Sequence, residues 1–82
     1  MRIVGKNNAV LATVTLCLTP EEAKELMDSV ADLIANPETH HHHISSNDYQ
    51  TEITVAVYTK ENFGSFDPAL QKIIGDVDEH AL

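Results

Sequence analysis

Two segments of alternating apolar and polar residues limit the folds that this chain can adopt. They span Ala9–Leu18 and Tyr49–Thr59, and both are rich in β-branched side chains. Side chains of a β-strand point alternately to opposite faces of a sheet, so this alternation indicates two long strands. Each strand has one apolar face, which is typical of a sheet that is covered on one side only.

A helix that covers this side is predicted from a strong start signal directly after the first long strand. Thr19 can act as the N-cap, Pro20 suits the first helical position, and Glu22 completes a capping box. The helix should run to about Ala35, because Asn36–Pro37 stops it. Its predicted apolar stripe consists of Ala23, Leu26, Met27, Val30 and Ile34, with Leu33 beside it.

A second helix is predicted near the C-terminus by the same reasoning. Asp67 can cap it, Pro68 suits its first position, and Phe66 is placed to pack against its first turns. Gly75 is expected to end this helix, since glycine is common just past the last helical residue. Its predicted buried stripe includes Leu70, Ile73 and Ile74.

Two short strands complete the predicted fold. Arg2–Val4 precedes a turn at Gly5–Asn8, and Thr39–Ile44 precedes a turn at Ser45–Asp48. We therefore expect an α+β fold of order ββαββα, with a mostly antiparallel four-stranded sheet and two helices on one face. Residues 1–82 should form a single domain, because so short a chain cannot fill two cores. The predicted core consists of Leu16, Leu26, Val30, Ile53, Val55, Ile73 and Ile74.

The charge of the chain restricts the partners that it can bind. Thirteen acidic side chains against five Lys and Arg give a formal net charge of −8. Such a charge disfavours nucleic acids and anionic membranes, and it favours a basic protein partner. Four acids should form one ridge on the outer side of the first helix, although a solvated helix face is the alternative interpretation. The ridge consists of Glu21, Glu25, Asp28 and Asp32.

The sequence gives no sign of secretion or membrane insertion. The N-terminus lacks a signal-peptide pattern, and no apolar run approaches the ~18 residues of a membrane span. A cytoplasmic location is therefore expected. Cys17 is the only cysteine, so it cannot form an intramolecular disulfide.

A run of four histidines, His40–His43, is the most conspicuous polar segment. If Ile44 points to the core, strand alternation directs His41 and His43 outward from the bare side of the sheet. Two imidazoles at this spacing can bind a divalent transition metal weakly, but a metal site normally needs a third ligand. That ligand could come from His80 and nearby acids or from a second subunit of a homodimer; otherwise the run is a solvated edge strand.

The bare face of the sheet is a second candidate for recognition, with a solvated face as the equal alternative. Its predicted members are hydroxyl, carboxylate, imidazole and phenol side chains. No phosphate loop and no nucleophile–base pair at a supporting spacing occur in the sequence, so a catalytic site and a resident cofactor are not expected. The predicted face carries Thr13, Thr15, Glu52, Thr54, Tyr58, His41 and His43.

Three segments, Thr13–Leu18, Ala23–Leu33 and His41–Ile44, together resemble one group of small α+β immunity proteins of bacterial polymorphic toxin systems. The resemblance covers about half of the chain, and the second helix from Asp67 onward lies outside it. It implies a cytoplasmic inhibitor that blocks a cognate toxin, often a basic nuclease, by charge complementarity.

Three functions of different kinds follow from these observations. The first is a non-enzymatic acidic binding protein that masks a basic protein surface, either as an immunity protein or as another inhibitor, including one of phage origin. The second is a metal- or small-ligand-binding module that uses the histidine strand, as a monomer or a homodimer. The third is a small enzyme with a His, Tyr and Glu site on the open face of the sheet.

Overall fold

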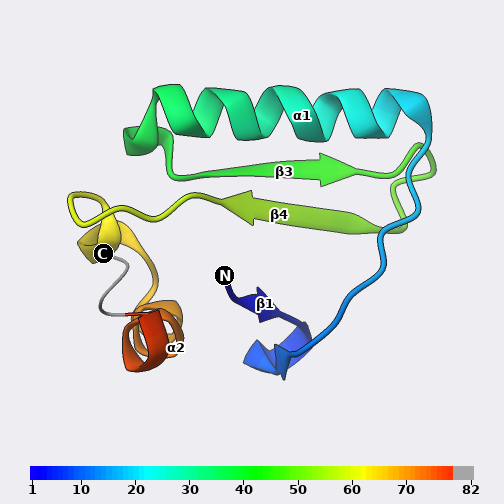
Figure 1. Ribbon diagram of the computed structural model, residues 1–82. Coiled ribbons are helices and arrows are strands. Elements are labelled where there is room, and N and C mark those ends of the chain that lie inside the picture. Colours follow the sequence, from blue (N-terminus) through cyan, green and yellow to red (C-terminus); the bar gives the residue numbers. More distant parts are fainter. Residues whose placement is uncertain (79–82) are drawn as a thin grey trace. The chain divides into compact units, whose positions relative to one another are not determined.

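The computed structural model describes residues 1–78 and has an α+β fold, as predicted (Figure 1). The chain folds into two compact units, Cys17–Thr59 and Met1–Leu16 with Lys60–Leu82. Its strands and α-helices are β1 (Ile3–Val4), β2 (Val10–Leu11), α1 (Pro20–Ala35), β3 (His41–Ser45), β4 (Glu52–Ala56) and α2 (Pro68–Asp78), and short 3-10 turns lie at Lys6–Asn8, Pro37–Thr39 and Phe63–Ser65.

The unit Cys17–Thr59 consists of helix α1 packed along an antiparallel hairpin of β3 and β4 (Figure 1). Leu33 of α1 is fully buried, and Ile44 of β3 is 2% exposed. Ile44 pairs with Ile53 of β4, whereas His41 and His43 of the same strand are exposed. The expected alternation along the histidine strand is therefore confirmed.

The start of α1 has the predicted capping box. The backbone N–H of Glu22 donates to the Thr19 hydroxyl at 3.2 Å, and the Thr19 N–H donates to a Glu22 carboxylate oxygen at 2.9 Å. The helix ends at Ala35, and Asn36 closes its last turn through a 2.7 Å bond from its N–H to the carbonyl oxygen of Asp32. Both predicted ends of this helix are confirmed.

The buried stripe of α1 is rotated from the predicted one. Leu33, predicted to lie beside the stripe, is its most buried member, whereas Met27 and Ile34 are 61% and 67% exposed. Leu26 and Val30 are half-buried. A two-stranded hairpin is too narrow to cover the whole stripe, so one of its edges remains in solvent.

The other unit begins with the predicted strand–turn–strand. β1 pairs antiparallel with β2, and Ile3 lies opposite Leu11. The turn takes its left-handed backbone from Asn7 and Asn8, at φ 59° and 61°, because asparagine tolerates this region better than most residues. Gly5 has an ordinary negative φ of −94°.

Helix α2 begins where the sequence predicts and ends later. The Ala69 N–H donates to an Asp67 carboxylate oxygen at 3.1 Å, and both Phe66 and Ile74 are 6% exposed. Gly75 does not end the helix, which continues to Asp78. One glycine in a helix costs only about 0.5–1 kcal/mol, and a side chain at Gly75 would contact the ring of Phe63 at 3.6 Å.

The predicted four-stranded ββαββα sheet is not confirmed, because β1–β2 and β3–β4 are separate two-stranded sheets. The first long strand stops at Leu11, and Ala12–Leu18 forms neither strand nor helix. Leu16, assigned to the core, is 48% exposed. The second long strand is also shorter than predicted, because β4 spans only Glu52–Ala56. Tyr49 lies in the turn before it, with φ 59° and 82% exposure.

Replacing Leu33 with alanine tests the rotation of α1. We expect Leu33→Ala to lower the free energy of unfolding by about 2–5 kcal/mol, since it leaves a cavity under a fully buried side chain. The neighbouring substitution Ile34→Ala removes a 67% exposed side chain and should change this free energy by no more than about 0.5 kcal/mol. Urea denaturation of both variants measures the difference. Equal losses, or a larger loss for Ile34→Ala, would contradict the observed burial.

Candidate functional site: an acidic groove beside helix α1

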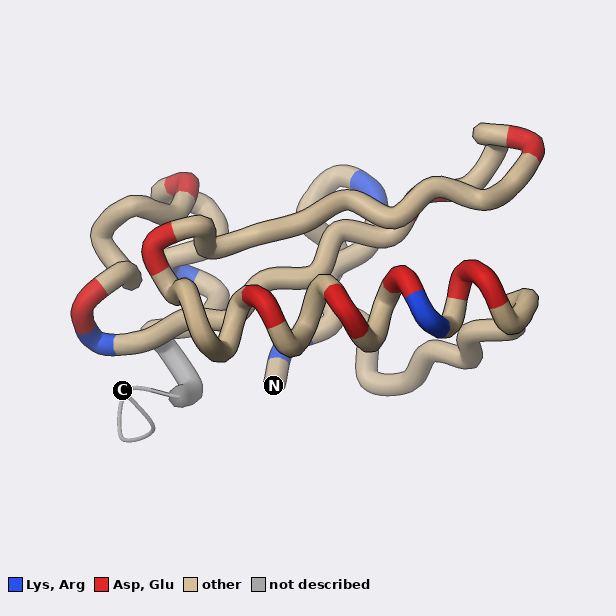
Figure 2. Tube along the Cα trace, turned by 90° about the horizontal axis from the view of Figure 1, so that it is seen from above, with Lys and Arg blue, Asp and Glu red and all other residues tan. Residues whose placement is uncertain are grey.

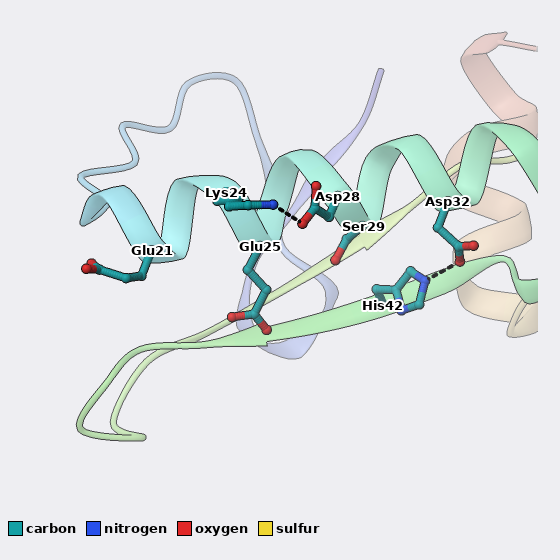
Figure 3. A pocket seen from close by; sticks show the side chains of 7 residues that line it. All are labelled: Glu21, Lys24, Glu25, Asp28, Ser29, Asp32 and His42. Carbon is teal, nitrogen blue, oxygen red and sulfur yellow. Dashed lines mark hydrogen bonds and ion pairs between the residues drawn. The ribbon is translucent and has the colours of Figure 1, made fainter.

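A shallow groove of about 470 Å³ runs along α1 on the side that faces β3 (Figure 3). All four acids of the predicted ridge line it, so the structure brings these predicted site residues together. They lie at the edge of the helix beside β3 and not on the outer side where the sequence predicted them, since Asp32 contacts His42 of β3. Figure 2 shows how the acids follow one another along the helix. We call this feature the acidic groove, and its lining residues are Glu21, Lys24, Glu25, Asp28, Ser29, Asp32 and His42.

His42 and Asp32 join the strand to the helix at one end of the groove. The Nε2 atom of His42 lies 2.7 Å from a carboxylate oxygen of Asp32 (Figure 3). The side-chain amide of Asn36 donates to the other oxygen at 2.9 Å. The hydrogen bond with His42, followed by that from Asn36, lowers the pKa of Asp32. This carboxylate is therefore held in place and ionised.

The other three carboxylates differ in how far their charge is already neutralised. Lys24 forms an ion pair with Asp28 at 2.9 Å, one turn away on the helix. Both side chains are largely exposed, so this pair adds little to stability. Within residues 1–78, Glu21 and Glu25 form no ion pair or side-chain hydrogen bond. Four carboxylates and one ammonium leave the groove with a net charge of −3 when His42 is neutral.

The open face of β3 and β4 carries part of the second predicted site. His43 lies opposite Thr54, and its Nδ1 atom is 2.9 Å from the Thr54 hydroxyl and 3.2 Å from a carboxylate oxygen of Glu52. These exposed side chains, with His41, lie on one face as expected.

The remaining members of that predicted face belong to no strand of the structure. Thr13 and Thr15 are exposed but belong to no strand, because β2 ends at Leu11. Tyr58 follows the end of β4 and is half-buried. Both predicted strands were therefore longer than the strands that the structure has.

The histidine rings gather at the start of β3. The His41 ring centroid lies 4.6 Å from that of His40 and 5.0 Å from that of His43. Loss of hydration beside the neighbouring rings lowers the pKa of His41, and positive charge on those histidines lowers it further. The described part of the chain holds no group of three His, Cys, Asp or Glu arranged for a metal ion, and His80 lies outside it.

Sequence reasoning missed the role of His42. Strand parity already places His42 on the same face as Ile44, which is the face that α1 covers. An ionisable side chain on the covered face needs a polar partner, and Asp32 on the nearby helix supplies it. The alternation of side chains along β3 could therefore have shown that His42 needs a polar partner. Identifying Asp32 as that partner also requires the orientation of α1 about its axis.

Comparisons with known proteins identify no relative: no family model, curated protein or solved structure matches the chain. Among residues 1–78, no helix has the length and apolar character needed to cross a membrane.

The hydrogen bond between His42 and Asp32 can be tested by titration. In His42→Phe we expect the pKa of Asp32 to rise toward its usual value of 3.8, because the largest cause of its lowering is removed. The carboxyl carbon signal of Asp32, followed by NMR against pH, measures this. His43→Phe is the control, since His43 contacts Glu52 instead. An unchanged Asp32 titration in His42→Phe would contradict the pair.

The same pair predicts the sign of a stability change with pH. A carboxyl group whose pKa is lower in the folded state stabilises the fold above its unfolded pKa. That stabilisation is lost as the pH falls through the folded pKa. The stability advantage of the wild type over His42→Phe should therefore be present at neutral pH and shrink below about pH 3.8.

Proposed function

We propose that this chain is a small acidic binding protein that masks a basic surface on another protein, as an inhibitor and without catalysis. The observation that carries the proposal is the acidic groove, in which Glu21 and Glu25 are not neutralised by any described residue while Asp32 is held ionised. A lysine or arginine side chain of a partner would find carboxylates there that need not leave an existing ion pair.

The distribution of charge supports the same partner class. The groove concentrates four of the thirteen acidic side chains on one side of one helix. Such a concentration attracts a positively charged protein from a distance and speeds its association, with an effect that weakens in salt. Nucleic acids and anionic membranes would be repelled by the same field.

The resemblance to small α+β immunity proteins supports a narrower form of this proposal. In that form the partner is a bacterial toxin with a basic active site, such as a nuclease, and the groove covers that site.

The histidine strand supports a second candidate, a module that binds a transition metal or a small ligand. The specific observation is the clustering of His40, His41 and His43, together with the lowered pKa of His41, since a metal requires a neutral imidazole. Zinc titration by calorimetry separates the two candidates. No heat at millimolar zinc would rule out the metal form of this second candidate.

Charge reversal within the groove tests the main proposal. The groove variant carries Glu21→Lys and Glu25→Lys, which change the net charge of the chain from −8 to −4. The control variant carries Glu38→Lys and Glu61→Lys, which make the same change at exposed positions outside the groove. Both double variants and the wild type are used as baits in extracts of the source cell, and captured proteins are identified by mass spectrometry. We expect a basic protein to bind the wild type and the control but not the groove variant.

Association rates then test whether the partner is attracted by the groove itself or by the net charge of the whole chain. With the captured partner, the groove variant should associate at least about tenfold more slowly than the control and should lose most of its salt dependence. An acidic partner, or equal rates for the two variants, would contradict the proposal. Substrate turnover by the purified chain alone would contradict it as a whole.

A further inference from the structure

The segment between β2 and α1 has the sequence of a strand without the hydrogen bonds of one. Ala12–Leu18 continues from β2 without a helical turn (Figure 1). Within the described residues, none of these seven takes part in a hydrogen bond. Val14 and Leu16, on its apolar side, are 49% and 48% exposed. β-branched and aliphatic side chains beside free backbone N–H and C=O groups make a template for pairing with another strand.

The charge of the surrounding sequence indicates which strand can pair with it. Residues 7–20 contain no Asp, Glu, Lys or Arg, and no other stretch of the chain without these residues is as long. A basic partner would be matched by acids, which this segment lacks. Two copies of a chain with a charge of −8 repel each other, so they can approach most closely through a neutral stretch. The segment therefore fits a second copy of the same chain.

We propose that the protein forms a homodimer in which Ala12–Leu18 pairs antiparallel with the same segment of a second copy. The alternation of side chains restricts the register of this pairing. The apolar side chains of the segment have even residue numbers, so an even-numbered residue of one copy must lie opposite an even-numbered residue of the other for these side chains to share one face. Centring the pair on Thr15, the midpoint of the segment, satisfies this. The resulting pairs are Ala12 with Leu18, Thr13 with Cys17, Val14 with Leu16, and Thr15 with Thr15.

This register gives each face of the new ribbon a consistent chemistry. On the apolar face, Val14 of one copy packs beside Leu16 of the other, so the exposed areas of both are reduced. On the opposite face, the two Thr15 hydroxyls meet at the two-fold axis, where threonine pairs are favourable. No like charges are brought together, because the segment contains no charged side chain.

Sedimentation equilibrium of the full chain at 0.05 M and 1 M NaCl tests the proposal. We expect a reversible dimer of twice the 9.0 kDa chain mass, with a dissociation constant that falls as salt screens the repulsion between copies. Binding to a basic protein has the opposite salt dependence, so the two proposals can fail separately. A monomer at both salt concentrations, at up to about 1 mM protein, overturns the dimer.

A charge at the two-fold axis tests the register. Thr15→Glu places two carboxylates opposite each other and should raise the dissociation constant at least about tenfold. Thr39→Glu adds the same charge at an exposed position outside the segment and should raise it much less. Both threonines are exposed in the single chain, so neither variant should unfold it. Equal effects of the two substitutions overturn the register.

A cysteine at the axis gives a positive readout. In a Cys17→Ser background, Thr15→Cys should form an interchain disulfide under mild oxidation, because opposed residues of antiparallel strands have Cα atoms about 4.5–5.5 Å apart. Thr39→Cys in the same background is the matched control. Gel electrophoresis without reductant should show a covalent dimer for Thr15→Cys at least about tenfold faster than for the control. Equal rates overturn the proposed pairing.

Discussion

The packing of α1 against the β3–β4 hairpin is the interaction on which the rest of the described site depends. Leu33 of the helix and Ile44 of the hairpin are the most completely buried side chains among the described residues. With Leu33 turned inward, the preceding residue, Asp32, lies at the edge of the helix and reaches His42. The other ridge acids follow at helical spacing along the same edge. Burial of one aliphatic side chain thus fixes where the acidic groove lies.

The same packing separates the polar surfaces of this unit. Burial of Ile44 directs His42 toward the helix and leaves His41 and His43 on the open face. The groove therefore holds four carboxylates on one side of the helix, while the open face holds imidazoles, hydroxyls and the carboxylate of Glu52. These two chemistries suit different ligands, which is why the two candidate functions use different sides of one hairpin.

The features that could be predicted from the sequence are those set by neighbouring residues. The capping box at Thr19 and the cap at Asp67 depend on hydrogen bonds within a few residues, and both form where expected. The ridge acids also share one side of α1 because helical spacing alone places them there. Local chemistry determines these features whatever the rest of the chain does.

The failed predictions concern features that depend on distant partners. Alternation in Ala9–Leu18 shows that a strand could form, but a strand needs hydrogen bonds from a neighbour, and β1 supplies one only as far as Leu11. Met27 and Ile34 have the spacing of a core stripe, yet a two-stranded hairpin cannot cover them. The hydrogen bond between His42 and Asp32 could not be predicted. It depends on which face of β3 carries His42 and also on which side of α1 faces the hairpin.

We expect positive charge on a partner to settle in the acidic groove rather than on acidic residues in general. Two-dimensional ¹H–¹⁵N NMR of the chain during titration with a short lysine- and arginine-rich peptide tests it most directly, with a glutamine-rich peptide as the control. We expect chemical-shift changes centred on Glu21, Glu25 and His42 that diminish as salt is added. Changes of equal size at Glu38, Asp48 and Glu61, or equal changes with the neutral peptide, would contradict it.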